Sequence, residues 1–536
     1  MAITGLSFTQ KGGVGLCLLM LSAVCCTHTL EHTFRSTYSD VNTMIHTANP
    51  APDYLKVHMK NGDVFVFVSG WVADSLGKTV TGAASRYDFN RLFIDSGAVA
   101  LQAADIAIIE TNRPIESLDG AVTSTLTSLT VMNVAITVAC IANPKACFGS
   151  CPTFYSGPST SVHYADAEGF SSSIAPSLEA ADTDPLQHPP IVDRQGRHRL
   201  TMKNEAYETH VVNSVALLAV PRHPGEQIVQ GNDQQFYAVT NITPPSHAAA
   251  KEGDAAWLLS QFDGNERTSR TNGENLQLRE EITLQFPYPT QGNGAIILGF
   301  RQSLLSTFLF YTALSWMGHS VSDVFAAMES DSSLRHAFCR TEDLLGGIDC
   351  FVWNSTAQRW DSVGTFKESG PLARNLMLVP IPAAANAKDS LRVKLRLTQG
   401  HWRLDCAMLA TIVGLRVPSV LHPIDVQRNG TPDTAAIRQL RGDDQQYLLS
   451  LPGDQFSLIF PQPSFGTNDA GNAQFFVRSK GYYLEWMRPA WNNPPQLPKL
   501  MAMVANNPVV WRELAVEFKG MEGGMEQEFW SSKVIQ

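Results

Sequence analysis

The sequence predicts a mainly β protein with a few helices, built from more than one folded unit. Short segments that alternate apolar and polar residues recur between residues 54 and 490, separated by Gly, Pro and Asn turns. One strongly helical segment, at 302–317, interrupts them. A chain of 536 residues also exceeds the roughly 250 to 300 residues at which a single core stops growing. We therefore expect two to four folded units.

Composition excludes some partners. The hydrophobic fraction of 44% and the charged fraction of 17% are typical of a globular chain. The net charge is -10, and no run of lysines or arginines provides a footprint for a nucleic-acid backbone. We expect no nucleic-acid partner.

The first 26 residues differ from the rest. Lys11 is their one charge, and it precedes the apolar run 12–26, which has the length of a signal-peptide core and is short for a membrane span. Export is the main interpretation, and a buried N-terminal helix is the alternative. The run ends in Cys25 and Cys26 and resembles a bacterial lipoprotein signal, in which a cysteine carries the lipid. The match departs at Val24, where such a signal normally has a small residue.

Residues 54–111 predict a small β-barrel-like domain that resembles the Sm or SH3-like kind. Two alternating segments flank Asn61-Gly62, the dipeptide that a two-residue hairpin turn favours, because both of its positions need positive φ. Gly77, Gly82 and Gly97 separate the later strands.

A hydrophobic helix is expected at 122–142, which holds no charge. Its length suits a membrane span, whereas its many Ser and Thr residues and Asn133 favour a buried linker. Both interpretations stay open.

Residues 147–300 predict a β-rich domain whose clearest part, 198–222, contains two half-buried strands. Core helices are expected at 301–330, where 302–317 is apolar on nearly all faces and Ser322 is placed as the N-cap of a second helix.

The region 347–490 predicts a C-terminal β-sandwich, and 491–536 a C-terminal tail. Two aromatic strands flank the turn 354–358, and 390–398 alternates strictly. Further strands are expected at 447–451, 455–460, 474–477 and 482–486, the last two divided by Gly481.

Six of the nine cysteines follow the signal region. Cys147 with Cys151, and Cys339 with Cys350, are the closest in sequence and are possible disulfides, although buried free thiols are an equal alternative. A zinc site is not expected, because no second ligand pair follows Cys147 and Cys151.

The stretch CFGSCPTFY, together with 198–220, 302–318, 391–405 and 475–486, resembles an uncharacterised group of lipoprotein-like bacterial envelope proteins. In that group a hairpin segment and a hydrophobic stretch precede a Cys-Pro pair that opens a long β-rich region. The resemblance implies an envelope location and fold similarity, and it carries over no catalytic residues. The group's Tyr-x-x-Asp-Gly-like turn is replaced here by Ser156-Gly157-Pro158.

A search for chemistry finds no catalytic, cofactor or metal residues. Gly318-His319-Ser320 is close to a nucleophile elbow, but a helical segment precedes it and Ser322 replaces the final glycine. Two acidic pairs are interpreted as solvated turns, Glu205 with Glu208 and Asp443 with Asp444. Scattered surface polarity is expected for four histidines, His188, His198, His210 and His223.

Aromatic residues concentrate in the C-terminal region, and exposed ones would suit carbohydrate or partner binding. The group comprises Trp353, Trp360, Trp402, Tyr482, Tyr483 and Trp486. Most are expected in the core, and alternation places Trp402 on the same face as Leu404.

The leading hypothesis is an exported protein of the bacterial cell envelope, on its outer-membrane or periplasmic side. It would act as a non-catalytic binding or scaffold module and need no cofactor. Its partners would be the membrane, through a lipid anchor or a hydrophobic helix, and envelope proteins or glycans. The alternatives are a hydrolase acting on an envelope polymer and an accessory subunit of a membrane complex, the latter only if 122–142 crosses the bilayer.

Overall fold

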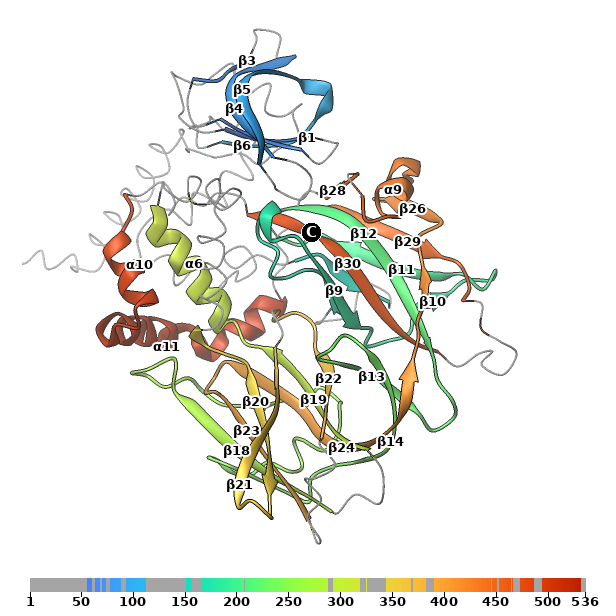
Figure 1. Cartoon of the computed structure of the whole chain (residues 1–536), viewed down its shortest axis with the longest axis vertical. Helices are drawn as coiled ribbons and strands as arrows, with labels where there is room; N and C mark the ends of the chain where they lie inside the picture. Colours follow the sequence, from blue (N-terminus) through green and yellow to red (C-terminus); the bar gives the residue numbers. More distant parts are fainter. Residues whose placement is uncertain are drawn as a thin grey trace, which may run out of the picture.

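The computed structural model confirms the mainly β class (Figure 1). It describes residues 55–59, 63–67, 70–73, 78–87 and 93–111, and residues 151–531 with gaps at 157–164, 207, 288–292, 319–323, 325–343, 368–369, 382–389, 445, 451–452, 464, 466–472 and 486–493. The expected signal segment, the hydrophobic helix 122–142, the turn Asn61-Gly62 and the helix start at Ser322 lie outside the described residues.

The N-terminal unit is a curled antiparallel sheet. Its elements are β1 (Leu55–Met59), β2 (Val64–Phe67), β3 (Val72–Ala73), β4 (Thr79–Tyr87), β5 (Phe93–Gln102), the single-turn η1 (Ala103–Asp105) and β6 (Ile106–Thr111). The two strands of the predicted hairpin are confirmed, since Leu55 pairs with Phe67 and His58 with Val64. β6 returns to pair with β1, and the sheet encloses a small core around Trp71.

The second unit is a β-sandwich. Its elements are β7 (Thr153–Tyr155), β8 (Ala167–Glu168), η2 (Pro176–Leu178), β9 (Ala180–Pro185), β10 (Ile191–Val192), β11 (His198–Lys203), β12 (Glu208–Pro221), β25 (Ser419–Leu421), β26 (Asp425–Arg428), β27 (Thr431–Pro432), α9 (Thr434–Gln439), β28 (Leu448–Ser450), β29 (Gln455–Phe460) and β30 (Ala473–Glu485). One sheet has the order β27-β26-β29-β11-β7-β8, and the other β25-β12-β30-β9. The core between them includes Phe154, Leu200, Leu217 and Leu458.

The third unit is inserted into the second, between β12 and β25. Its strands are β13 (Gln227–Gly231), β14 (Phe236–Thr243), β15 (His247–Ala250), β16 (Gly253–Asp254), β17 (Arg267–Thr268), β18 (Arg279–Pro287), β19 (Asn293–Gln302), β20 (Ile348–Asn354), β21 (Arg359–Phe366), β22 (Asn375–Pro380), β23 (Ser390–Thr398) and β24 (Trp402–Arg416). The ring β14-β13-β22-β19-β24 closes because β24 also pairs with β14, and the sheet β16-β15-β18-β23-β20-β21 packs against it.

Two apolar faces explain the continuous hydrophobic runs of β19 and β24. Alternate residues point to opposite faces of a strand. Ile297 of β19 and Met408 of β24 belong to the core inside the ring, whereas Ile296 and Leu409 belong to the core shared with the second sheet. Trp402 is buried in that shared core together with Leu404, which the sequence placed on the same face.

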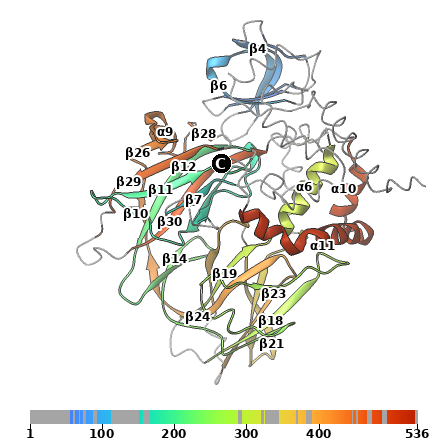
Figure 2. The same cartoon turned by 180° about the vertical axis from the view of Figure 1, so that it is seen from behind.

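Three further helices complete the described fold: α6 (Leu305–Met317), α10 (Leu497–Val504) and α11 (Pro508–Ser531). α6 confirms the predicted helix. The segment 491–536, expected as a tail, instead holds α10 and α11, which lie beside α6 (Figure 2). Phe518 of α11 packs on Phe308 of α6, and Trp511 is buried in the same core. The apolar residues that dock these helices are interspersed with charges, so the sequence alone did not indicate a packed partner.

The domain boundaries also differ from those expected. Residues 147–300 and 347–490 do not form separate units, because each contributes strands to both the sandwich and the inserted unit. The expected break at Gly481 is absent as well, and β30 runs unbroken past it. A Cβ at residue 481 would stand 2.4 Å from the carbonyl oxygen of Val211, so glycine permits the close approach of β12.

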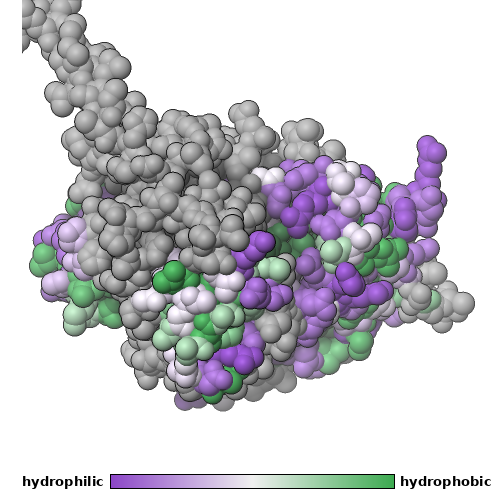
Figure 3. Space-filling view, turned by 90° about the horizontal axis from the view of Figure 1, so that it is seen from above, coloured by the Kyte–Doolittle hydropathy of each residue, from purple (hydrophilic) through white to green (hydrophobic). Residues whose placement is uncertain are grey.

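The surface of the described residues mixes hydrophilic and hydrophobic side chains when seen from above (Figure 3). Within the described part of the chain, no helix has the length and apolar character needed to cross a membrane.

A charge cluster with two buried arginines fixes α11 to the inserted unit. The Glu526 carboxylate accepts hydrogen bonds from Arg403 Nη2 at 2.6 Å and Arg301 Nη2 at 3.1 Å. Arg301 is only 1% exposed and also pairs with Glu266 at 2.6 Å. The two arginines lie on neighbouring strands, β24 and β19, so one carboxylate connects the helix to both.

We predict that Glu526→Ala lowers the free energy of unfolding by about 3 kcal/mol, because it removes a carboxylate from two buried guanidinium groups. Urea denaturation measures the loss. Glu513→Ala is the matched control on the same helix, since its partner Lys499 is exposed and 3.3 Å away, and its expected effect is within about 0.5 kcal/mol. Equal losses in both variants would contradict this account.

Candidate functional site

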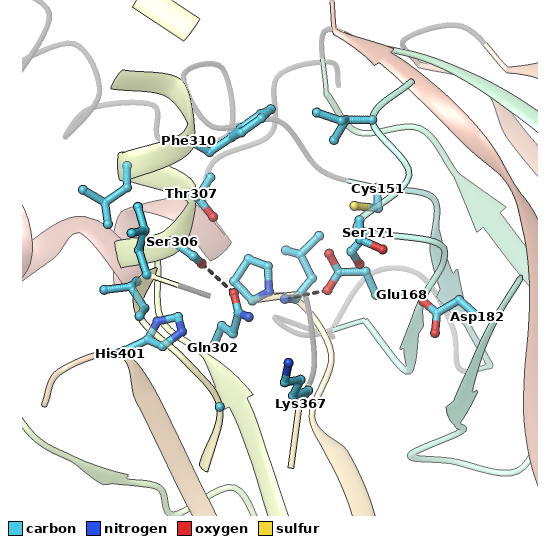
Figure 4. Close-up of a pocket in the computed structure, with 18 of the residues that line it drawn as sticks. Cys151, Glu168, Ser171, Asp182, Gln302, Ser306, Thr307, Phe310, Lys367 and His401 are labelled. Atoms are coloured by element: carbon cyan, nitrogen blue, oxygen red, sulfur yellow. Dashed lines mark hydrogen bonds between the residues drawn. The ribbon is translucent and has the colours of Figure 1, made fainter. Parts of the chain in front are cut away.

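A cavity of about 580 Å³ lies where the sandwich, the inserted unit and the helices meet. Its wall combines residues of β8, β9, β12 and β30 with residues of α6 and α10 and the loop 370–374 (Figure 4). These segments are distant in sequence. Only the insertion of one unit into another brings them together.

One side of the cavity is apolar. It is formed by Leu309, Phe310, Ala313, Met317, Leu344, Leu345, Met377, Leu500, Met503 and Val504. Phe310 of α6 projects toward the cavity in Figure 4. α6 is apolar on nearly all faces, so it can pack on α11 and line the cavity at the same time. Phe308 contacts α11, and Phe310 lies on the cavity side.

The opposite wall is polar and acidic. It carries Cys151, Glu168, Ser171 and Asp182, which Figure 4 shows on the sandwich side. Burial raises the pKa of Glu168 to about 7, although hydrogen bonds from two backbone N–H groups oppose the shift. Burial also raises the pKa of Asp182 to about 6.

Glu168 links the sandwich to the inserted unit. Its Oε2 atom accepts hydrogen bonds from the backbone N–H groups of Leu372 at 2.9 Å and Ala373 at 3.3 Å. The loop that it holds passes so close that a Cβ at Gly370 would stand 2.4 Å from the same oxygen.

Two further contacts hold this loop from the side of the inserted unit. The Gly370 carbonyl accepts a hydrogen bond from the backbone N–H of Gln302 at 3.2 Å. Arg374, at the other end of the loop, pairs with the buried Asp405 at 2.7 Å. The loop is therefore fixed at both ends as well as at its centre.

A set of buried polar contacts surrounds the acidic wall. Tyr311 of α6 donates a hydrogen bond to Glu485 of β30, which ties the helix to the sandwich. The Tyr483 hydroxyl donates to the Ser171 carbonyl at 3.0 Å. In the same wall, Glu208 is fully buried and its Oε1 atom lies 2.8 Å from the Nε2 atom of a buried histidine at residue 210.

His401 and Trp402 form another part of the lining. His401 is 2% exposed, and burial lowers its pKa to about 3, so its imidazole is neutral at physiological pH. Its Nδ1 atom and the Trp402 Nε1 atom are buried and have no hydrogen-bond partner among the described residues. Beside them, Ser306 donates to Gln302 Oε1 at 2.5 Å (Figure 4).

The four histidines singled out in the sequence do not share a site. His198 and His210 are buried, which corrects the expectation of surface polarity for these two residues. His188 and His223 are exposed, as the sequence predicted, and the His188 Nδ1 atom lies 2.6 Å from a carboxylate oxygen of the buried Asp166. Within the described ranges, no group of His, Cys, Asp and Glu is arranged to hold a metal ion.

The cysteines with described positions are buried. Cys151 and Cys350 are free thiols, whereas their nearest partners in sequence, Cys147 and Cys339, lie outside the described residues. Cys25, Cys26, His319 and Ser320 also lie outside them.

The first acidic pair is not a solvated turn. Glu205 accepts a hydrogen bond from the Tyr155 hydroxyl at 2.6 Å, while Glu208 is buried in the cavity wall. In the second pair, Asp443 is largely exposed and accepts a hydrogen bond from Lys480 at 2.7 Å. Of the second pair, Asp443 has the exposure that the sequence predicted, and Asp444 is partly exposed.

Two of the aromatic residues singled out in the sequence meet on the second sheet of the inserted unit. Trp353 of β20 and Trp360 of β21 have ring centroids 5.4 Å apart, and the Arg392 guanidinium lies within 5.4 Å of both rings. Tyr482 and Tyr483 are buried instead, and the sixth aromatic, at residue 486, is outside the described residues.

Sequence reasoning missed Glu168 and Asp182. The sequence feature that could have indicated them is an acidic residue between small residues, such as Glu168 between Ala167 and Gly169. That signal is weak, because burial at this point depends on a loop residue that lies 204 positions further along the chain.

The fold and the cavity together define a mainly β protein of nested units with an internal ligand-sized space. No protein-family model matches this chain, and no curated protein matches its sequence.

The raised pKa of Glu168 makes one contribution to the pH dependence of stability. Its folded-state pKa is raised from 4.5 to about 7, so the protonated form is favoured in the folded protein. That contribution is complete below about pH 4.5 and is lost as the pH rises through about 7. His401 acts in the opposite direction, because its pKa is lowered. The effect of Glu168 must therefore be measured as a difference between variants.

We predict that the wild type loses stability relative to Glu168→Gln as the pH rises from about 4.5 to about 7. The glutamine keeps an acceptor for the loop and cannot ionise, so the contributions of groups that do not interact with Glu168 cancel in the comparison. Urea denaturation across this pH range measures the difference.

The control is Glu281→Gln, which replaces an exposed carboxylate paired with Lys394 and should retain the wild-type pH dependence. A Glu168→Gln profile parallel to that of the wild type would refute the assignment.

Proposed function

We propose that this chain is an exported, envelope-associated protein that acts as a non-catalytic binding module, and that a small ligand occupies the cavity beside α6. The supporting observation is the cavity itself, with a volume of about 580 Å³ and an apolar lining interrupted by a few polar groups. Small-molecule sites usually have this size and composition.

Preorganisation supports the proposal. The cavity walls are held by the Tyr311–Glu485 contact, by the Glu168 hydrogen bonds to the loop and by the packing of α6 on α11. A ligand entering a preformed space loses less free energy to ordering the protein than one that must organise it.

The hydrolase alternative has less support. Glu168 has the raised pKa expected of a general acid, but its Oε2 atom already accepts two backbone hydrogen bonds that hold the loop. We assign Glu168 a structural and ligand-binding role.

We propose a membrane association through lipidated Cys25 or Cys26, with the hydrophobic segment 122–142 as the alternative, and with envelope proteins or glycans as further partners. The apolar run that ends in these cysteines supports the anchor. The association with a membrane complex depends on 122–142 and is the weaker proposal.

We predict that a bulky side chain in the cavity weakens the binding of an apolar fluorescent probe. Thr307 of α6 lines the cavity (Figure 4). N-phenyl-1-naphthylamine should bind the wild type saturably at one site, and Thr307→Trp should weaken its affinity at least about tenfold by filling the space, a loss of about 1.4 kcal/mol. Fluorescence titration measures the affinity.

Val516→Trp is the matched control, because it adds the same ring on the exposed side of α11, where Val516 is 64% exposed. Circular dichroism checks that both variants fold. Binding to Thr307→Trp with wild-type affinity would rule out the cavity as the binding site.

The anchor is tested by labelling cells with radioactive palmitate. We expect the label on the wild-type protein in the membrane fraction, and its loss when Cys25 and Cys26 are both replaced by Ser, because the acceptor thiol is gone. Native protein that is cytosolic and still begins with Met1 would contradict export.

A further inference from the structure

The cavity lining carries more acidic than basic groups. Among the described residues that line it, the acidic ones are Glu168, Asp182, Glu208 and Glu485, and the basic side chain that is charged at neutral pH is Lys367. The lining histidine at residue 401 adds no positive charge, because burial lowers its pKa to about 3. Carboxylates that share a low-dielectric space create a negative potential there.

Neutral donors contact Glu168 and Asp182. Glu168 accepts from the N–H groups of Leu372 and Ala373, and Asp182 Oδ1 accepts from Thr183 N at 2.8 Å. A carboxylate has about four lone-pair positions, so each retains capacity for another donor. An ionised carboxylate that is removed from water without a countercharge is unfavourable, and a cation placed beside it reduces that penalty.

Among the described residues, the lining also contains a buried polar atom without a hydrogen-bond partner. His401 lines the cavity, is 2% exposed, and has a buried Nδ1 atom with no hydrogen-bond partner in the described part of the chain. In Figure 4 it lies across the cavity from Glu168. The Nδ1 atom has less than 1 Å² of accessible surface, so it does not face the cavity space, which is defined instead by the apolar side and the acidic wall.

We propose, resting on the proposed function, that the ligand is an amphiphile with a protonated primary amine. Its apolar body would lie against α6 and α10, and its ammonium group would lie at the wall of Glu168 and Asp182. A primary ammonium provides three N–H donors and a positive charge, which suits two carboxylates with spare lone pairs. A carboxylate ligand would be repelled, and a neutral one would leave the charges unpaired.

Binding of such a ligand depends on pH, because the two carboxyl groups must be ionised to pair with it. Burial raises their pKa values to about 7 and about 6, so affinity rises between pH 5.5 and pH 7.5. Among the residues that the structure describes, the other titratable or charged groups at this wall are Cys151, Asp184, Glu208, Tyr311, Lys367, His401, Arg478, Tyr483 and Glu485.

The test compares three probes of equal chain length on the wild-type protein: decylamine, decanol and decanoate. Each competes with N-phenyl-1-naphthylamine below its micellar concentration. At pH 7.5 decylamine should bind at least about tenfold more tightly than decanol, and decanoate more weakly than both. At pH 5.5 the preference for decylamine over decanol should shrink severalfold.

Variants test whether Glu168 and Asp182 cause the preference for decylamine over decanol. Glu168→Gln combined with Asp182→Asn should lower the ratio of decylamine affinity to decanol affinity to about one, whereas Glu281→Gln on the exposed face should leave that ratio at its wild-type value. Decanol or decanoate binding as tightly as decylamine would overturn the amine inference and leave cavity binding intact. If neither N-phenyl-1-naphthylamine nor any of the three probes binds, both the proposed cavity binding and the amine inference are overturned.

Discussion

The antiparallel pairing of β12 with β30 is the constraint on which the rest of the molecule depends. It runs from Glu208 opposite Glu485 to Pro221 opposite Ala473, with one irregularity after residue 212. The pairing joins strands that are distant in sequence, so the chain between them must leave the sandwich and return. Both faces of β12 are buried, because its alternate residues enter the sandwich core and a second core against the inserted unit.

That constraint also produces the cavity. The insertion carries α6 out between β19 and β20, and the chain after β30 returns as α10 and α11 to cover it. The space is therefore bounded by three layers that belong to different parts of the sequence. Glu168 contacts the loop of the inserted unit, and Glu526 fixes the covering helix α11 to β19 and β24.

The two acidic contacts have opposite electrostatic character. Burial opposes the ionisation of Glu526, but the two arginines that it faces outweigh burial and lower its pKa. Glu168 faces neutral backbone donors in its described hydrogen bonds, and burial raises its pKa. The first arrangement is a completed ion-pair cluster that stabilises the fold. The second leaves capacity for a positive charge, which is a property of a binding site.

The sequence by itself determined the class of the protein and many of its local elements. Alternation predicted β11, β12 and β23, the turn residues predicted the β1–β2 and β20–β21 hairpins, and an apolar segment predicted α6. These features depend on neighbouring residues, which a linear pattern records. Only the tertiary structure decided which strands pair, that Gly481 permits a close approach instead of a break, and that Glu168 and His401 share one cavity. Pairing partners and burial depend on contacts between residues hundreds of positions apart, and a local pattern contains no record of them.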